Sequence, residues 1–382
     1  MATPTSQFAS ADSSSIVSSP LTKDGAEQLR QWKSSGAILT FQRWVTIIGG
    51  LAVAGLVVCV LCLQFGATKI DMRTVMAVLS RWSGIGAPDT AGTDTSAVIM
   101  FHIRLPRVLT GFLVGGGLAI VGVTLQALLR NPLADPYILG VSSGAALGVS
   151  LAMLFGIGTT LAFLPGLPLF GFVGGLLSLV VMYRLARSRG RLPIQSVLLA
   201  GVILNAMLTA VIMFITSIMD PNRSAGLMAW LMGSLTVSNY GILSMFALYV
   251  VGGASLLLQK AQTMNILTFG EETARSLGVD TERVKKRLFF LAALLTGAVV
   301  SVSGMIGFVG MIVPHAVRML VGSDHRVLLP ASMLAGGMFL VAADTVARTI
   351  LAPAEIPVGI VTALTGGPMF LYLLLWRKDQ LV

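Results

Sequence analysis

The sequence predicts an all-α fold: a polytopic membrane protein with ten transmembrane helices, some of them short or broken. Of its 382 residues, 55% are hydrophobic and only 11% are charged, whereas about a quarter of the residues in a soluble domain are charged. Stretches such as 108–129 and 238–258 contain no Asp, Glu, Lys or Arg, and each has about the 20 residues that cross a bilayer. Glycines recur four residues apart, as in Gly140, Gly144 and Gly148, a spacing that lets membrane helices pack closely.

Residues 1–43 differ from the rest of the chain in composition. They are rich in Ser and Thr, and their first basic residue is Lys23, so no charged segment leads directly into a cleavable apolar stretch. A polar segment of this kind buries too little apolar surface to fold by itself. We therefore expect a disordered cytoplasmic N-terminal tail at 1–43, followed by a transmembrane domain at 44–378.

Ten apolar segments follow the tail. The eighth, 309–320, is too short to cross the bilayer unaided, and we expect a half-helix that other parts of the protein cover. The ten segments are 44–66, 108–129, 137–157, 160–183, 193–217, 238–258, 288–307, 309–320, 328–347 and 357–376.

The distribution of basic residues predicts the orientation of these segments. With the N-terminus inside, most of the 26 Lys and Arg residues fall in cytoplasmic connections, as the positive-inside rule requires. Both termini of this multi-pass protein are then cytoplasmic. The basic residues left on the outward side are Lys69, Arg73, Arg81, Arg104, Arg107, Arg223 and Arg348.

The sequence shows no nucleotide, metal or nucleic-acid site of its own. It lacks the motif G-x-x-x-x-G-K-[ST] that binds ATP phosphates. His102, His315 and His325 are not at metal-ligand spacing, and Cys59 and Cys62 lie in an apolar run, where a packing role is favoured over chemistry. Despite the net charge of +10, no basic face carries interleaved aromatic residues that would hold a nucleic acid. We expect no metal, no cofactor and no enzyme activity.

Asp344 is the main acidic candidate within an apolar segment. Many proton-coupled carriers depend on such groups within the membrane, and an ion-gradient-driven secondary transporter stays open as an alternative. Asp344 precedes Arg348 by four residues, however, a spacing that favours a local ion pair. A transporter that receives its energy from a separate partner therefore fits the sequence better.

Three groups of motifs stand out from the apolar background. The first is IRLPR at 103–107, followed by LRNPLADP at 129–136 and LGVSSG at 139–144. Pro132 and Pro136 bracket a short polar stretch and force a tight turn there, because proline disfavours helix at and before its own position.

The second is the long polar connection 259–287. Within it, GEETARSLGV at 270–279 predicts a short amphipathic helix with acids in its first turn and Gly278 near its end. A rigid helix of this kind suits a soluble partner, and a plain solvated loop is the alternative.

The third is GFVGMIVPH at 307–315 with EIPVGIVT at 355–362 and GGP at 366–368. Glycine and proline within apolar segments indicate short or broken helices.

In this order, the motifs resemble the permease subunit of ATP-binding-cassette (ABC) importers for iron chelates and vitamin B12, over roughly residues 45–378. The resemblance implies a homodimer around a central pathway in the bacterial inner membrane. It also implies two copies of a cytoplasmic ABC ATPase that dock on residues 264–283, and a periplasmic or lipid-anchored substrate-binding protein. The cargo is then a ferric siderophore, haem or cobalamin, and these three stay open.

The resemblance also assigns roles to particular residues. Arg104 and Arg107 of IRLPR, and Arg348 of the D-x-V-A-R sequence at 344–348, match arginines that meet acidic residues of the binding protein, a task that suits the planar guanidinium. Ordinary placement of arginine at helix ends is the alternative. The residues that match the ATPase-coupling segment are Gly270, Glu271, Ala274, Arg275 and Gly278. The stretch 218–233, with a short helix at 225–232, is expected to form a gate at the outer mouth.

Overall fold

The computed structural model describes residues 40–66, 70–73, 75–76, 95–157, 160–161, 164–187, 193–236 and 239–376. The chain divides into two compact units, Met1–Thr46 and Ile47–Val382. In the first unit only residues 40–46 are described, and they include the start of a helix. The predicted tail at 1–43 therefore falls almost wholly outside the described residues. Everything below concerns the second unit.

Helices make up almost all of the regular structure in the described residues. The exception is a small antiparallel pair, β1 (Thr160–Leu161) and β2 (Leu164–Pro165). The helices are α2 (Phe41–Gln64), α4 (Thr95–Ile99), the π-helix η1 (Met100–Arg104), α5 (Leu105–Leu129), the 3-10 helix η2 (Pro136–Leu139), α6 (Val141–Leu154), α7 (Gly166–Ala186), α8 (Ile194–Ile218), α9 (Pro221–Leu231), α10 (Tyr240–Leu258), α11 (Ala261–Thr268), α12 (Glu271–Ser276), α13 (Thr281–Ser303), α14 (Val309–Val321), α15 (His325–Thr349) and α16 (Val358–Trp376).

Each of the ten predicted apolar segments contains a helix, so the all-α prediction is confirmed. Within the described residues, seven helices are long and apolar enough to cross a membrane, and three apolar helices are shorter. The shorter ones are Val141–Leu154, Val309–Val321 and Val358–Tyr372. The shortness of α14 agrees with the half-helix expected at 309–320, whereas a total of ten membrane crossings stays a prediction.

Two predicted segments extend beyond their helices. The segment 137–157 begins with η2, and Gly140 then adopts φ +73°, so α6 starts only at Val141. A left-handed residue ends one helical run and forces the next to begin afresh. The segment 160–183 begins with the β1–β2 pair, and α7 starts at Gly166. Apolar composition alone did not reveal these breaks.

The centre of the core is α5, which packs against α13, α14 and α15. Backbones approach closely where glycines meet: a Cβ added to Gly115 would lie 2.2 Å from the Gly336 oxygen, and one added to Gly122 would lie 1.7 Å from the Gly310 oxygen. A Cβ added to Gly148 would lie 2.1 Å from the Phe170 oxygen between α6 and α7. Packing of this kind replaces the hydrophobic driving force that is missing between helices in lipid.

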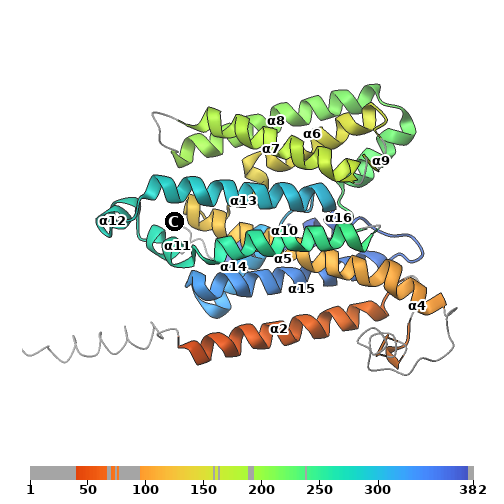
Figure 1. The fold of residues 1–382 in the computed structure, drawn as a ribbon, viewed down its shortest axis with the longest axis horizontal. Coiled ribbons are helices and arrows are strands. Elements are labelled where there is room, and N and C mark those ends of the chain that lie inside the picture. The colour runs from red at the N-terminus through yellow and green to blue at the C-terminus, as the bar shows by residue number, and fades with distance from the viewer. Residues whose placement is uncertain are drawn as a thin grey trace, which may run out of the picture. The chain divides into compact units, whose positions relative to one another are not determined.

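The short helices lie at the two ends of the long ones. Figure 1 shows α11 and α12 together at one end, and α4 and α9 at the opposite end. The two regions that carry the predicted functional residues are therefore separated by the length of the helix bundle.

Candidate functional site

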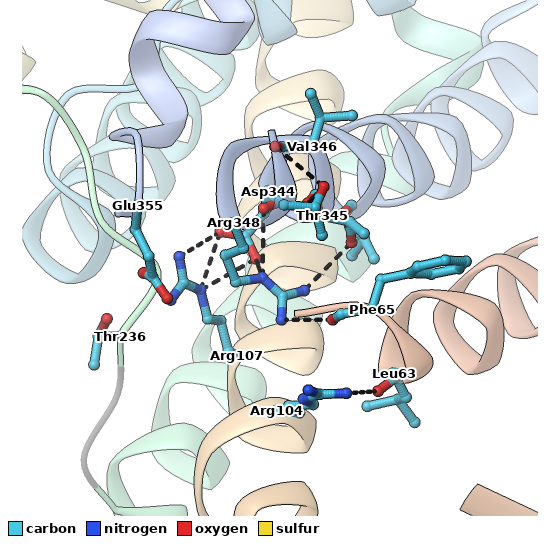
Figure 2. Close-up of polar contacts among 12 residues, drawn as sticks. Leu63, Phe65, Arg104, Arg107, Thr236, Asp344, Thr345, Val346, Arg348 and Glu355 are labelled. Carbon is cyan, nitrogen blue, oxygen red and sulfur yellow. Dashed lines mark hydrogen bonds and ion pairs between the residues drawn. The ribbon is translucent and has the colours of Figure 1, made fainter. Parts of the chain in front are cut away.

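Three predicted arginines meet in one polar cluster at the end that carries α4. Arg104 is the last residue of η1, Arg107 lies in the first turn of α5, and Arg348 lies in the last turn of α15. Figure 2 shows their guanidinium groups around Asp344 and the end of α2. We call this cluster the arginine site; its residues are Arg104, Arg107, Asp344, Arg348 and Glu355.

Asp344 is the centre of the ionic contacts in the arginine site. Arg107 donates to it from Nε, 3.0 Å to Oδ1 and 3.1 Å to Oδ2, and from Nη2, 2.9 Å to Oδ1. The Nε of Arg348 lies 2.9 Å from Oδ2, so the local ion pair predicted from the four-residue spacing is confirmed. The second nitrogen branch of Arg107 donates to Glu355 at 2.7 Å. One buried carboxylate thus joins α5 to α15.

The other two arginines hold the end of α2. Arg104 donates from Nη1 to the carbonyl oxygens of Leu63 and Gln64 at 2.8 and 2.9 Å, and Arg348 donates to that of Phe65 at 3.3 Å. The last carbonyl groups of a helix lack partners within the helix and carry partial negative charge. Cationic donors at this position satisfy them, which fixes the end of α2 against α5 and α15.

The arginine site is mostly closed. The exposed fraction is 3% for Arg104 and 4% for Arg348, while the side chain of Arg107 is 12% exposed and that of Glu355 is 49% exposed. Only Arg107 and Glu355 therefore offer polar surface in this conformation. The predicted contact of all three arginines with a binding protein stays a prediction, and for Arg104 and Arg348 it requires a rearrangement.

At the opposite end, the short helix predicted within 270–279 is present as α12. Gly270 precedes it with φ +116° and Gly278 follows it with φ +81°, a conformation that glycine adopts without strain. Ala274 is fully buried, and Glu271 pairs with Arg275 at 3.6 Å. All five predicted coupling residues therefore lie in or directly beside one helix.

Sequence reasoning missed two features beside α12. The preceding polar stretch also forms a helix, α11, and two large apolar side chains flank α12 in the open: Phe269 is 75% exposed and Leu277 is 64% exposed. Exposed apolar residues around a charged helix are typical of a surface that another protein covers. The sequence does place Phe269 and Leu277 directly beside the predicted helix, and this position could have indicated that they are exposed.

The predicted gate contains a helix, α9, that begins earlier than expected. Asp220 accepts a hydrogen bond from the amide of Asn222 and Pro221 occupies the first turn, an arrangement that starts a helix. Arg223 donates to the Leu154 carbonyl at 3.0 Å, at the end of α6. Beyond the other end of α9, the Ser234 amide donates to the Ser303 carbonyl at 2.8 Å.

The described residues contain no group of three or more His, Cys, Asp or Glu side chains that could hold a metal ion. Two ends of a helix bundle thus carry polar surfaces, one closed around arginines and one built on a short exposed helix.

Comparison with known proteins decides the family. Residues 53–376 match the model of the FecCD transport family. The chain belongs to this family. A cobalamin import system permease protein of Halobacterium salinarum is 47% identical over 75% of this chain and 75% of its own length. A hemin transport system permease protein of Yersinia pestis is 40% identical over 83% of this chain and 91% of its own.

A solved structure shows the same fold. It is a metal-chelate type ABC transporter in an inward-facing conformation, with a TM-score of 0.73, 33% identity, and coverage of 87% of this chain and 99% of that one. Membership in the FecCD family makes this chain a membrane-embedded transport component and not an enzyme, with ATP hydrolysis carried out by a separate subunit. The resemblance inferred from the motifs is therefore confirmed.

Proposed function

We propose that this chain is the permease subunit of an ABC importer that moves a metal chelate (a ferric siderophore, haem or cobalamin) across the bacterial inner membrane into the cytoplasm. The observation that carries the proposal is the match over 53–376 to a transport family whose cited relatives are named for cobalamin import and hemin transport. A relative of Haemophilus influenzae, 36% identical over 85% of this chain, is named for molybdate import. The cargo test therefore includes an oxyanion.

The ATPase contact is proposed at α12. Its surface combines the acidic first turn, Glu271 and Glu272, with the exposed apolar side chains of Phe269 and Leu277. Apolar anchors surrounded by charged residues make good docking sites because the anchors supply burial and the charges set the orientation. Two ATPase copies, one for each permease of a homodimer, would dock on the segment that Gly270, Glu271, Ala274, Arg275 and Gly278 build. Direct contact would be made by the exposed side chains of Phe269, Glu272 and Leu277.

A homodimer around a central pathway is supported by the exposed faces of α8 and α16. Both helices leave large apolar side chains uncovered in the single chain, among them Met207 and Phe214 on α8 and Leu364 and Leu371 on α16. A second copy and membrane lipid are the two surfaces that would cover them. Cysteine pairs at these positions that cross-link two copies in native membranes support the dimer, and cross-links that never exceed random collision oppose it.

Docking of a substrate-binding protein is proposed at the arginine site, with distinct parts for its members. Arg107 holds the exposed carboxylate of Glu355 on one nitrogen branch, and a carboxylate of the binding protein would replace Glu355 there. Arg104 and Arg348 hold the end of α2 that borders this position. Glu355→Gln should then strengthen binding of the partner and Arg107→Gln should weaken it. Equal binding to both variants contradicts this assignment.

The orientation follows from the same proposal. With α12 in the cytoplasm and the arginine site outside, both chain termini face the cytoplasm. Single cysteines test this orientation in a chain without Cys59 and Cys62. Leu277→Cys, at an exposed position, should react with a membrane-impermeant thiol reagent only from the inside. Glu355→Cys, also at an exposed position, should react only from the outside.

The deciding experiment reconstitutes the permease with its ATPase and binding protein in liposomes. Haem, cyanocobalamin, a ferric hydroxamate siderophore and molybdate are offered in turn. ATP-dependent accumulation of one of the three chelates is expected, with none when the ATPase is omitted. Uptake by the permease alone, driven by a proton or sodium gradient, would instead establish the secondary-transporter alternative.

A further inference from the structure

A buried lysine lies where the proposed ATPase contact joins the membrane domain. Lys285 is in the first turns of α13, and its side chain is only 7% exposed. It is the one lysine that the structure buries among the residues it describes. Its aliphatic stem lines a small apolar cavity together with Leu129, Ile194 and Phe289, so the ammonium group lies at the boundary between the apolar core and the charged surface of α12.

The ammonium group of Lys285 is held by carboxylates from two helices. Its Nζ lies 3.1 Å from Oε1 of Glu271 on α12 and 2.6 Å from Oε1 of Glu282 on α13. Arg275 on α12 approaches the same two carboxylates at longer distances, 3.6 and 3.8 Å. Each helix thus contributes one acid and one base. The short ion pair between the helices is the one from Lys285 to Glu271, and a hydrogen bond from Nε of Arg275 to Oγ1 of Thr281, at 3.1 Å, also joins them.

Loss of all carboxylate partners of Lys285 should cost more than loss of an ordinary surface ion pair. Lys285 is shielded from water, and a buried ammonium that loses its carboxylate partners is costly. The other side of the cluster is open: a cleft of about 480 Å³ lies between these charges and Pro193, Ile194 and Gln195 at the start of α8. Among the residues that the structure describes, α11 and α13 are the helices that pack most against α12, so its position depends mainly on its contacts with them.

Helix α13 leads from this cluster into the core. Beyond Lys285 it buries Phe289, Leu295 and Val299 and packs against α5, α7 and α10. Two distant sites are coupled when both of them shift the equilibrium between two arrangements of the element that connects them. A displacement of α12 that carries α13 with it would therefore reach the centre of the bundle directly.

We propose that Lys285 is a positioning residue that ties the coupling helix α12 to α13 through Glu271, so that movement of α12 by the ATPase becomes movement of α13. The proposal rests on the proposed function, since it concerns the same ATPase contact. Within it, Glu271 acts through Lys285 and not by contact with the ATPase.

Two matched variants distinguish loss of the Lys285–Glu271 ion pair from loss of a negative charge in general. Glu271→Gln removes the ion pair between Lys285 and α12, leaves the hydrogen bond from Arg275 to Thr281 in place, and leaves Lys285 paired with Glu282, so the lysine keeps a partner. Glu282→Gln removes the pair within α13 and the longer, 3.8 Å pair to Arg275, but leaves the contact from Lys285 to Glu271. The two glutamates are almost equally exposed, 27% and 28%, and each variant removes one negative charge.

The experiment uses the complete complex in liposomes, with haem, cyanocobalamin or a ferric hydroxamate siderophore as the probe. The number of molecules transported for each ATP hydrolysed should fall by about fivefold or more in Glu271→Gln, the lower end of typical coupling effects, and stay within about twofold in Glu282→Gln. Lys285→Met should lower this ratio as much as Glu271→Gln does. Lys285→Arg should keep the ratio close to the wild-type value. The ATPase should co-purify equally with all variants.

Hydrogen exchange gives a second measurement that does not need transport. The amides of residues 271–276 should exchange faster in Glu271→Gln than in Glu282→Gln. Equal effects of the two variants on both measurements, or loss of ATPase binding in Glu271→Gln, overturn the proposal. A wild-type complex that transports none of the probes counts against the proposed function, whereas the exchange data still decide whether the tie exists.

Discussion

Arg107 and Asp344 form a bidentate pair between α5 and α15, although 237 residues separate them in the sequence. Asp344 is 2% exposed and also pairs with Arg348. The carboxylate therefore shares its single negative charge between two guanidinium groups in a region from which water is nearly excluded. Its loss leaves both cations without their shared partner.

We expect Asp344→Asn to lower the free energy of unfolding by about 3–5 kcal/mol, as is typical when one member of a buried ion pair is removed. Thermal unfolding of the purified protein in detergent measures the change. Glu355→Gln is the control, because Glu355 is half exposed and exposed pairs contribute about 1 kcal/mol or less. Equal destabilisation by the two variants would contradict a central role for Asp344.

The arginine site shows where sequence reasoning ends. The pair of Asp344 with Arg348 follows from their spacing on one helix, and so it was predicted. The pair of Asp344 with Arg107 depends on how α5 packs against α15. The hydrogen bonds of Arg104 and Arg348 to the end of α2 depend on how that helix end meets η1 and α15. No local pattern contains such information. Three arginines that were assigned one role therefore differ in their contacts: Arg107 and Arg348 share Asp344, whereas Arg104 binds only the end of α2 among the contacts described above.

The helix bundle was easier to predict. Apolar length identifies a membrane helix because charge is costly in the bilayer, and a short helix with acids at its start marks α12. The breaks were harder: Gly140 separates η2 from α6 through a left-handed conformation, and β1–β2 precede α7. Apolar residues continue through both breaks, and only backbone conformation reveals them.

Close backbone contact predicts which glycines tolerate a methyl group. A Cβ on Gly122 would lie 1.7 Å from the Gly310 oxygen, whereas one on Gly252 has nothing within 4 Å. Gly122→Ala must separate α5 from α14, and we expect a loss of about 1–3 kcal/mol in stability, as in other overpacked cores. Gly252→Ala should unfold at the wild-type temperature or slightly above. Comparable unfolding temperatures for the two variants would show that the helices are less tightly packed.

A carboxylate in the connection between α5 and η2 predicts a pH dependence. Burial raises the pKa of Asp135 from 3.8 to about 6, although a hydrogen bond from the Tyr137 amide opposes the shift. The folded state then holds this proton more tightly than the unfolded state, so the contribution of Asp135 to stability is greatest below pH 4 and is lost as the pH rises to about 6. Above that pH the contribution is constant.

Unfolding of the wild-type protein and of Asp135→Asn in detergent, measured at intervals between pH 4 and pH 7, isolates this contribution. As the pH rises to about 6, the unfolding temperature of Asp135→Asn should increase relative to that of the wild-type protein. At higher pH the difference between the two temperatures should stay level. A difference that is the same at every pH in this range would show that Asp135 does not gain its proton there.

The last prediction concerns α9, the helix in the expected gate. Arg223 donates to the carbonyl groups of Met153 and Leu154 at the end of α6, and it lies where a Cβ on Gly156 would be 3.2 Å from its guanidinium. The contact adds a side-chain donor at the end of α6, where carbonyl groups lack helical partners; the Met153 carbonyl also accepts from the Gly156 amide at 3.1 Å. We therefore expect Arg223 to hold α9 on α6, and its replacement to free this end of the helix.

Leu227 offers a reporter on α9, because its side chain is fully buried and becomes accessible when the helix moves. In a chain with Cys59 and Cys62 replaced, we expect Arg223→Gln to raise the rate at which Leu227→Cys reacts with a water-soluble thiol reagent by about threefold to tenfold. This factor corresponds to a net loss of roughly 1 kcal/mol in hydrogen bonding. Asn222→Ala, which changes an exposed neighbour, should leave the rate unchanged. If α9 opens during transport, ATP should raise the reaction rate of the cysteine on α9 in the wild-type complex. The effect of ATP should be smaller in Arg223→Gln, where the helix is already released. An equal effect of ATP in both would show that the contact of Arg223 with α6 has no part in gating.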